Sequence, residues 1–504
     1  MIARKSALII FIQLLNGILG FIGLKFIAVY MQPWEYGVVG FAYGFVALFS
    51  IFGDLGFGAA HVKRISEGKD EGKCVGTFAA TKLILTGVLA SATILSIFLW
   101  RFVFGRGFES PLHEQAVYIL LFYFVLTNLT QVFTTTFSAK KEIAKGQIPY
   151  FIYTIIRVFI TIIIAYFGFG VLALAYTYLL GEIFQFAIAY YFFRTYPVKK
   201  PSIDYLKNYV KFAFPMAIAS AASIVILNVD KVFIQLFWGA QQVGEYFAVF
   251  NLSRFILNFS SALAVLLLPT ISEYHTKNYM DDIRKLTLAS ERYLSMITFP
   301  IVILLVVLAE PVIHILLSDQ YLPALTVLQI LPFFVLFEVL SQPYQSQLQG
   351  MNMPHIVRNR IILMMIVSII LNIILVPVDI KSLGLKLAGL GITGSALAIV
   401  IAYFVGFITT RVYAFRVANM KGNNRILLHL LAAVLMGMIV YFSVHILSIS
   451  RWYELVGICL LGLLCYFFIL FLLREFKKED LNLFLDTLNI KKMVSYVWSE
   501  VRKK

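Results

Sequence analysis

Charged side chains occur inside long apolar stretches of this sequence, where a charge is energetically expensive. A charge at the centre of a bilayer costs about 2.5–3.5 kcal/mol even on a lenient insertion scale, so such residues are expected to face a cavity or one another. The basic members of the set are Lys25, Lys82, Arg157, Lys231 and Arg254. The acidic members are Asp54, Glu182, Asp230 and Glu338. The slight excess of positive charge favours an anionic ligand.

Arg157 and Arg254 carry the most specific chemistry in this set. A guanidinium group stays charged and can hold phosphate oxygens through two parallel hydrogen bonds. Both arginines fall near the middle of apolar stretches, so a cavity or a structural ion pair is expected to hold them. We therefore predict a cationic cavity for a phosphate-bearing cargo, with these binding residues: Arg157, Arg254, Lys25, Lys231 and Lys82.

The acidic residues suit a different role. A carboxylate inside a transporter can bind a proton or sodium ion, so we predict four candidates for ion coupling: Glu182, Asp230, Glu338 and Asp54. For Asp54, Lys82, Lys25, Asp230 and Lys231, which lie toward span ends, snorkelling to an interface is an alternative. The three cysteines show no metal-ligand spacing, and no glycine loop for a nucleotide is present. We expect no cofactor, no metal and no catalytic residues.

The elements that position these residues are predicted to be membrane-spanning helices. The chain is 61% hydrophobic and 13% charged, about half the charged fraction of a soluble protein, and its mean hydropathy is +0.87. This composition excludes a soluble enzyme. Stretches of about 20 apolar residues predict about fourteen spans: 8–30, 37–60, 76–100, 115–138, 147–168, 171–193, 208–237, 243–271, 293–317, 323–348, 358–377, 387–410, 426–447 and 453–473.

Lysine and arginine set the orientation of these spans. They are concentrated in every second connection, which predicts that both termini are cytoplasmic in a multi-pass protein of the cell (plasma) membrane. The net charge of +16 is then explained by basic segments beside an anionic leaflet, and nucleic acid is not expected as a partner. The first apolar stretch has no cleavage motif and is predicted to be an uncleaved span.

The sequence also repeats itself weakly. The turn Gln32–Gly37 returns at Ala240–Gly244, and Phe137–Lys140 corresponds to Leu348–Met351, both about 210 residues later. We therefore predict an all-α polytopic protein of two six-helix lobes, 1–200 and 201–420, related by a pseudo-two-fold axis along the membrane normal. Two extra transmembrane helices, 421–475, and a basic cytoplasmic tail, 476–504, are predicted to follow.

Several short motifs carry a resemblance to a known family. Gly53–Ala60 followed by Lys63-Arg64 resembles the end of the second helix in Wzx-like polysaccharide-export flippases of the multidrug/oligosaccharidyl-lipid/polysaccharide (MOP) exporter superfamily. Pro33–Gly37 is similar to their first outer turn, Val229–Lys231 and Val243–Tyr246 to the start of their second lobe, and Leu267–Ser272 to the end of their eighth helix. The resemblance covers roughly residues 1–415 and implies movement of polyprenyl-(pyro)phosphate-linked saccharides from the inner to the outer leaflet.

Two other functions are compatible with the class of fold. A small-molecule or multidrug exporter would favour acidic and aromatic cavity residues over arginines. A polyprenyl-dependent glycosyltransferase or polymerase would need a carboxylate or metal cluster in a substantial outer loop. The longest outer loops, 101–114 and 378–386, hold Glu109, Glu114 and Asp379 without such a cluster. The sequence therefore favours a flippase in which the two lobes alternate access to the cavity.

Overall fold

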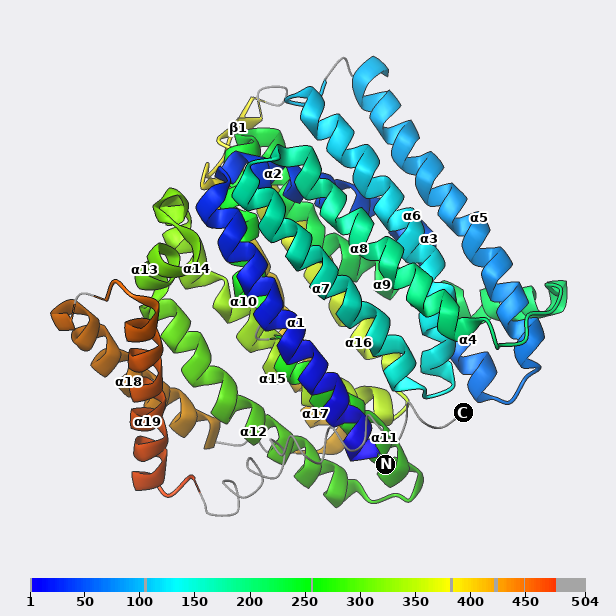
Figure 1. The fold of residues 1–504 in the computed structure, drawn as a ribbon. Helices are drawn as coiled ribbons and strands as arrows, with labels where there is room; N and C mark the ends of the chain where they lie inside the picture. The colour runs from blue at the N-terminus through cyan, green and yellow to red at the C-terminus, as the bar shows by residue number, and fades with distance from the viewer. Residues whose placement is uncertain are drawn as a thin grey trace. The chain divides into compact units, whose positions relative to one another are not determined.

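The computed structural model describes residues 2–103, 107–254, 257–380, 384–420, 425–447 and 449–476, and these residues are mainly helical (Figure 1). Among them, twelve helices are long and apolar enough to span a membrane, and the bent pair Pro33–Phe49 and Ile51–Ser66 makes a thirteenth if it is one span. The predicted all-α, polytopic membrane class is confirmed. The count of fourteen stays a prediction, because the span expected at 243–271 covers α10 (Ala240–Arg254), α11 (Leu257–Thr276) and residues 255–256, which lie outside the described part.

The chain divides into two compact units. Unit 2 consists of Ile18–Phe247 and Asn372–Gly391, and unit 1 contains residues up to Gly17, Ala248–Leu371 and the described residues from Ile392 onward. Three divisions fall inside α1 (Ile2–Tyr30), α10 and α16 (Pro354–Leu375), and the fourth falls after Gly391, the first residue of α17 (Gly391–Ala418). The lobes 1–200 and 201–420 and their pseudo-two-fold axis stay predictions. Beyond Phe476, the predicted tail lies outside the described residues.

Unit 2 is a bundle in which long helices pack side by side. Its other helices are α2 (Pro33–Phe49), α3 (Ile51–Asp54), α4 (Phe57–Ser66), α5 (Glu71–Phe98), the π-helix η1 (Leu99–Val103), α6 (Pro111–Ala139), α7 (Ile143–Phe167), α8 (Gly170–Phe193) and α9 (Ile203–Trp238). Helix α6 contacts α2, α5 and α8, and α8 also contacts α7 (Figure 1). A small antiparallel pair, β1 (Asp379–Ile380) and β2 (Leu385–Lys386), interrupts the otherwise helical unit.

Unit 1 contains the remaining helices. They are α12 (Met280–Val307), α13 (Ala309–Val312), the π-helix η2 (Ile313–Leu317), the 3-10 helix η3 (Asp319–Ala324), α14 (Leu325–Ile330), α15 (Pro332–Gly350), α17 (Gly391–Ala418), α18 (Arg425–Leu447) and α19 (Trp452–Leu472). Helix α12 contacts both α15 and α18, and α18 contacts α19. The predicted extra pair, α18 and α19, is anchored by Glu475, which forms ion pairs with Arg292 of α12 at 2.5 Å and Arg425 at 3.5 Å.

The second span breaks where its sequence permits left-handed backbone. Leu55 and Gly56, between α3 and α4, adopt φ values of +44° and +78°, and the 41° bend of the span lies one turn earlier, between Pro33–Phe49 and Ile51–Ser66. Glycine takes this conformation at little cost, and Asp54 supports the turn by accepting hydrogen bonds from the backbone N–H groups of Gly56 and Gly58 at 3.2 and 3.1 Å. The Gly53–Gly58 motif therefore separates α3 from α4, and the carboxylate of Asp54 stabilises the turn between them.

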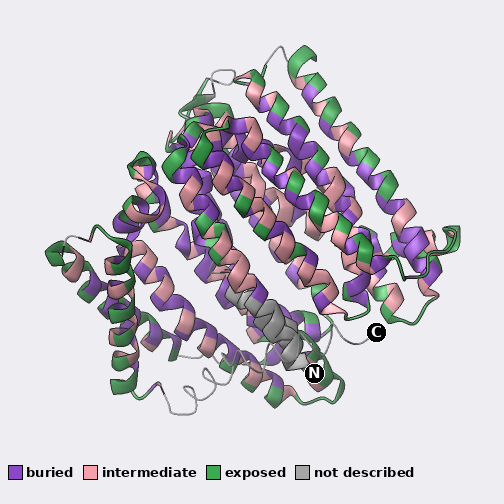
Figure 2. Cartoon of the chain, in the orientation of Figure 1, coloured by how far each residue is buried: buried purple, intermediate pink, exposed green. Residues whose placement is uncertain are grey.

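Several helices carry many exposed residues along their length (Figure 2), and large apolar side chains are frequent among these exposed residues. On α5, Leu83 and Ile84 are more than 60% exposed, and on α19 so are Leu464 and Phe468. Apolar patches of this extent are unfavourable in water and are covered by lipid in a membrane protein. The burial pattern agrees with the membrane class.

Three helices extend beyond the predicted spans. Helix α12 begins at Met280 instead of near residue 293, α16 begins at Pro354 instead of 358, and α17 ends at Ala418 instead of 410. Helices continue past the hydrocarbon core, where hydropathy no longer marks them. Two charged residues that lie outside the predicted spans therefore belong to helices: Glu291 and Arg411.

Candidate functional site

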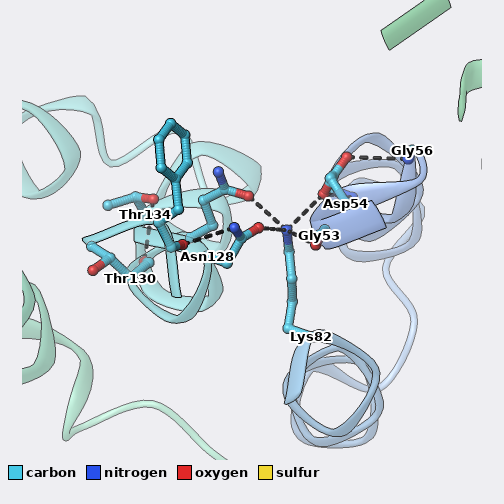
Figure 3. A network of polar contacts seen from close by, with 10 residues as sticks. Gly53, Asp54, Gly56, Lys82, Asn128, Thr130 and Thr134 are labelled. Carbon is cyan, nitrogen blue, oxygen red and sulfur yellow. Dashed lines mark hydrogen bonds and ion pairs between the residues drawn. The ribbon is translucent and has the colours of Figure 1, made fainter. Parts of the chain in front are cut away.

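Lys82 and Asp54 form an ion pair inside unit 2 (Figure 3). The Lys82 side chain is fully buried, and its Nζ lies 2.8 Å from Asp54 Oδ1. The same ammonium group donates to Gly53 O at 3.0 Å, to Asn128 Oδ1 at 3.4 Å and to Gln131 Oε1 at 2.6 Å. Lys82 therefore does not snorkel, and the geometry favours a role in holding the break between α3 and α4 against α6.

Arg157 has a different environment, although it also lies within unit 2. Its guanidinium carbon is 3.7 Å from the centre of the Tyr178 ring, a close cation–π contact between α7 and α8. Within the described part of the chain, no carboxylate lies at ion-pairing distance from Arg157. Its side chain is only partly buried.

Glu182 lies on α8 close to this arginine in the fold. A Cβ atom placed on its neighbour Gly181 would be 3.3 Å from Arg157 Cβ, which shows how closely α7 and α8 approach. Glu182 is 2% exposed and accepts a hydrogen bond from Thr130 Oγ1 at 2.6 Å. Among the described residues it has no basic partner within ion-pairing distance. A buried carboxylate without a counter-ion is suited to taking up a proton or a cation.

Asp230 and Lys231 pair with each other on α9. Lys231 Nζ lies 3.1 Å from Asp230 Oδ1 and also donates to Leu227 O at 2.6 Å. Both side chains are almost fully buried. Asp230 Oδ2 is buried without a hydrogen-bond partner in the described structure, so this carboxylate keeps one acceptor oxygen open.

The two remaining cations of the predicted cavity are not part of these clusters. Arg254 is exposed at the end of α10, with its guanidinium 5.7 Å from the Phe250 ring. Lys25 is half-buried on α1 and has an interaction partner. The structure thus groups Lys82 with Asp54 and Lys231 with Asp230, and it does not join Arg157 to either pair.

Glu338 is held by a partner that sequence reasoning missed. Arg360 of α16 donates to Glu338 Oε2 at 2.6 Å and to Gly406 O at 3.2 Å, and its side chain is 2% exposed. A second pair in unit 1 joins the buried Glu291 of α12 to Arg411 of α17 at 3.3 Å. The acidic first turn of α12 is a helix-start signal that would have placed Glu291 in a helix.

The described residues contain no group of three or more histidine, cysteine or acidic side chains able to hold a metal ion. The aromatic surroundings of Arg157 were also missed by sequence reasoning. Tyr43 contacts both Tyr123 and Tyr178, at ring distances of 6.3 and 5.8 Å. These rings come from α2, α6 and α8, and no spacing in the sequence connects them.

Comparison with known proteins places the chain in a family. A model of the family described as polysaccharide biosynthesis protein matches residues 27–326. The chain belongs to this polysaccharide biosynthesis protein family. A relative, the probable low-salt glycan biosynthesis flippase Agl15 of Haloferax volcanii, is 22% identical over 404 residues, covering 80% of this chain and 81% of the relative. The predicted relationship to a polysaccharide family is confirmed by this family model.

Solved structures show that this member of the polysaccharide biosynthesis protein family has the MOP fold. The lipid II flippase MurJ in an inward closed conformation has a TM-score of 0.74 and 16% identity, covering 92% of this chain and 97% of that chain. An inward-facing multidrug resistance MATE transporter of the MOP superfamily has a TM-score of 0.61 and 17% identity, covering 83% and 100%. Since both classes of transporter share the fold, the choice of cargo depends on the site.

Proposed function

We propose that this protein is a flippase that moves polyprenyl-(pyro)phosphate-linked oligosaccharides or polysaccharide repeat units from the inner to the outer leaflet. The observation that carries the proposal is the state of Arg157. An arginine in the middle of a span, stacked on Tyr178 and without a carboxylate partner in the described structure, keeps its hydrogen-bond donors available for an anion. A phosphate group matches the guanidinium in charge and geometry.

The mechanism that we propose uses the residues in distinct roles. The phosphate of the cargo binds Arg157, with Lys25 of the same unit as a further cationic contact, and the lipid tail stays in the bilayer. Alternating access of the two lobes then brings the head group to the outer side. Glu182 and Asp230 are the proposed ion-coupling residues. Glu182 is a buried carboxylate without a basic partner among the described residues, and Asp230 has one buried oxygen, Oδ2, without a hydrogen-bond partner. Lys82, Asp54 and Glu338 are assigned to structural ion pairs.

The cellular setting follows from the same proposal. Both termini are cytoplasmic and the membrane is the plasma membrane, as the distribution of lysine and arginine between alternate connections indicates. The protein acts as a transporter and not as an enzyme, with a lipid-linked saccharide as its cargo.

Depletion of the protein in its own cells tests this function. An impermeant glycan-labelling probe applied to intact cells and to opened cells reports how much lipid-linked saccharide faces each side. We expect depletion to trap the labelled lipid on the cytoplasmic side, and re-expression of the wild-type chain to release it. Unchanged sidedness with a shorter or missing glycan would instead indicate an enzyme, and an unchanged lipid pool with drug sensitivity would indicate a small-molecule exporter.

A further inference from the structure

Unit 2 contains a cavity of about 480 Å³ that none of the predicted site residues lines. It lies between α2, the segment before α6 and the last turns of α9, at the end of the unit predicted to face outward. Six aromatic side chains contribute to its wall: Phe41, Phe45, Trp100, Phe108, Phe237 and Trp238. Its volume falls in the range of about 300–1,000 Å³ that is usual for small-molecule sites.

Several of the aromatic walls are fixed in place. Trp238 Nε1 donates to Val376 O at 2.8 Å, which holds the indole ring. Phe41 meets Phe108 and His113 edge to face, with ring distances of 6.0 and 5.7 Å. The cavity therefore presents flat apolar faces that exist before a ligand binds.

Two buried polar atoms of the lining lack a hydrogen bond among the described residues. His113 is 2% exposed, and its Nδ1 is 2.9 Å from Ser110 Oγ, but its Nε2 has no hydrogen-bond partner and is 3.7 Å from Glu109 Oε2. Gln235 lies beside His113 and interacts with it, but the two side chains do not reach hydrogen-bonding geometry, and Gln235 Oε1 is also buried without a hydrogen-bond partner. Buried polar groups are rarely left in this state unless a ligand or water completes them.

Glu109 argues against an organic cation as that ligand. Its Oε2 already accepts hydrogen bonds from Gln235 Nε2 at 2.6 Å and from the backbone N–H of Ala240 at 3.0 Å. The carboxylate is therefore neutralised in part by donors of the protein. The groups left open are a ring nitrogen and an amide oxygen, and a hydroxyl group can accept from His113 Nε2–H while it donates to Gln235 Oε1.

We propose that this aromatic cavity is a binding site for a neutral saccharide. One face of a sugar ring packs its C–H groups on the aromatic walls, and a hydroxyl group bridges His113 and Gln235. Such a ligand combines the apolar face and the paired donor and acceptor that the lining offers. Its place in transport rests on the proposed function: the cavity would receive the saccharide head group of the cargo, separately from the phosphate at Arg157.

Saturation-transfer NMR on the purified full-length protein in lipid nanodiscs, with maltose as the probe, tests this site. We expect transfer to the ring C–H protons of maltose in the wild-type protein. Gln235→Met keeps the size of the side chain and removes the acceptor, so it should weaken maltose binding about tenfold, as expected for one lost hydrogen bond. The matched control Gln241→Met, whose glutamine bonds Glu245 outside the cavity, should bind as the wild type does.

Other results would overturn the site. Absence of transfer to maltose in the wild type, or equal binding by the wild type and Gln235→Met, contradicts it. Binding of farnesol or tetraphenylphosphonium at the cavity in place of maltose would show a lipid or cation site instead. Arg157→Ala should bind maltose as the wild type does. If the wild-type protein flips its cargo but does not bind maltose, only the saccharide site is rejected. If it binds maltose but does not flip, the proposed transport is rejected and the saccharide site stands.

Discussion

Gly37 and Gly244 pack backbone against backbone within unit 2. A Cβ atom on Gly37 would lie 2.8 Å from Gly244 N and 1.8 Å from Ala240 O. The contact is reciprocal, since a Cβ atom on Gly244 would lie 2.9 Å from Gly37 N and 1.7 Å from Pro33 O. These two glycines correspond to each other in the predicted repeat, and they bring the backbones of α2 and α10 into direct contact.

Gly37→Ala should therefore destabilise the protein. The added methyl group has backbone as its neighbour, which cannot rotate away, so the helices must separate at a cost of about 2–3 kcal/mol. The thermal unfolding midpoint in detergent measures the effect. Gly87→Ala is the matched control, because nothing lies within 4 Å of a Cβ there, and alanine favours a helix. Equal midpoints for Gly37→Ala and the wild type would contradict the packing.

Lys82→Met should destabilise the protein by about 3–5 kcal/mol, because it leaves buried acceptors without their donor. Asp54→Asn should cost less, since Asp54 is 32% exposed and its turn retains the same backbone. In a double-mutant cycle of urea unfolding, the two changes should be non-additive. The exposed pair Lys277–Glu273 serves as a control, and Lys277→Met should have no measurable effect. Additive effects at Lys82 and Asp54 would reject their coupling.

Glu182 and Glu338 should respond differently to the same substitution. Glu338→Gln breaks the ion pair with the buried Arg360 and should lower stability by about 3 kcal/mol, while the dependence of transport on the coupling ion is kept. Glu182→Gln keeps the bond with Thr130 and should fold normally but lose that dependence. Transport at several proton and sodium gradients, together with unfolding midpoints, separates the two. The opposite pattern would exchange the roles of the two carboxylates.

The connection before α7 should be less stable in acid. Burial by itself raises the pKa of Glu142, but hydrogen bonds from Lys145 and Tyr196 outweigh it and hold the pKa below its usual value of 4.5. Because the folded-state pKa is the lower one, the stabilisation is present above about pH 4.5 and is lost as the pH falls through the folded value. Unfolding midpoints between pH 6 and about 3.5 should therefore fall less steeply in Glu142→Gln. Parallel curves for variant and wild type would refute this.

Much of the fold was predictable because hydropathy reports directly on the lipid environment. Thirteen of the predicted spans coincide with helices or with the bent pair that pass the same test in the structure. The ends were less predictable, since α12 and α17 continue into the head-group region, where polar residues are tolerated. That is why Glu291 and Arg411 were assigned to inner segments.

The sequence predicted which charged residues lie inside the spans, but it did not predict which residues each of them contacts. The cost of burying charge pointed to Arg157, Lys82 and Glu182, but not to what each would contact. Lys82 forms its ion pair with Asp54 because α3 ends at that residue. The tyrosine rings near Arg157 are brought together by the packing of three helices. Contacts of this kind depend on tertiary structure, which local sequence patterns do not encode.

The most direct test of the account is flipping by Arg157→Ala in liposomes with a fluorescent polyprenyl-pyrophosphate saccharide. Arg194→Ala is the matched control, because Arg194 also stacks on a tyrosine, Tyr191 at 4.2 Å, but is exposed outside the spans. Arg157→Ala should insert and fold normally yet lose transport at least about a hundredfold, in line with the loss of a charge-assisted contact to the phosphate, while Arg194→Ala should transport normally. Transport by Arg157→Ala at the wild-type rate would contradict the central claim.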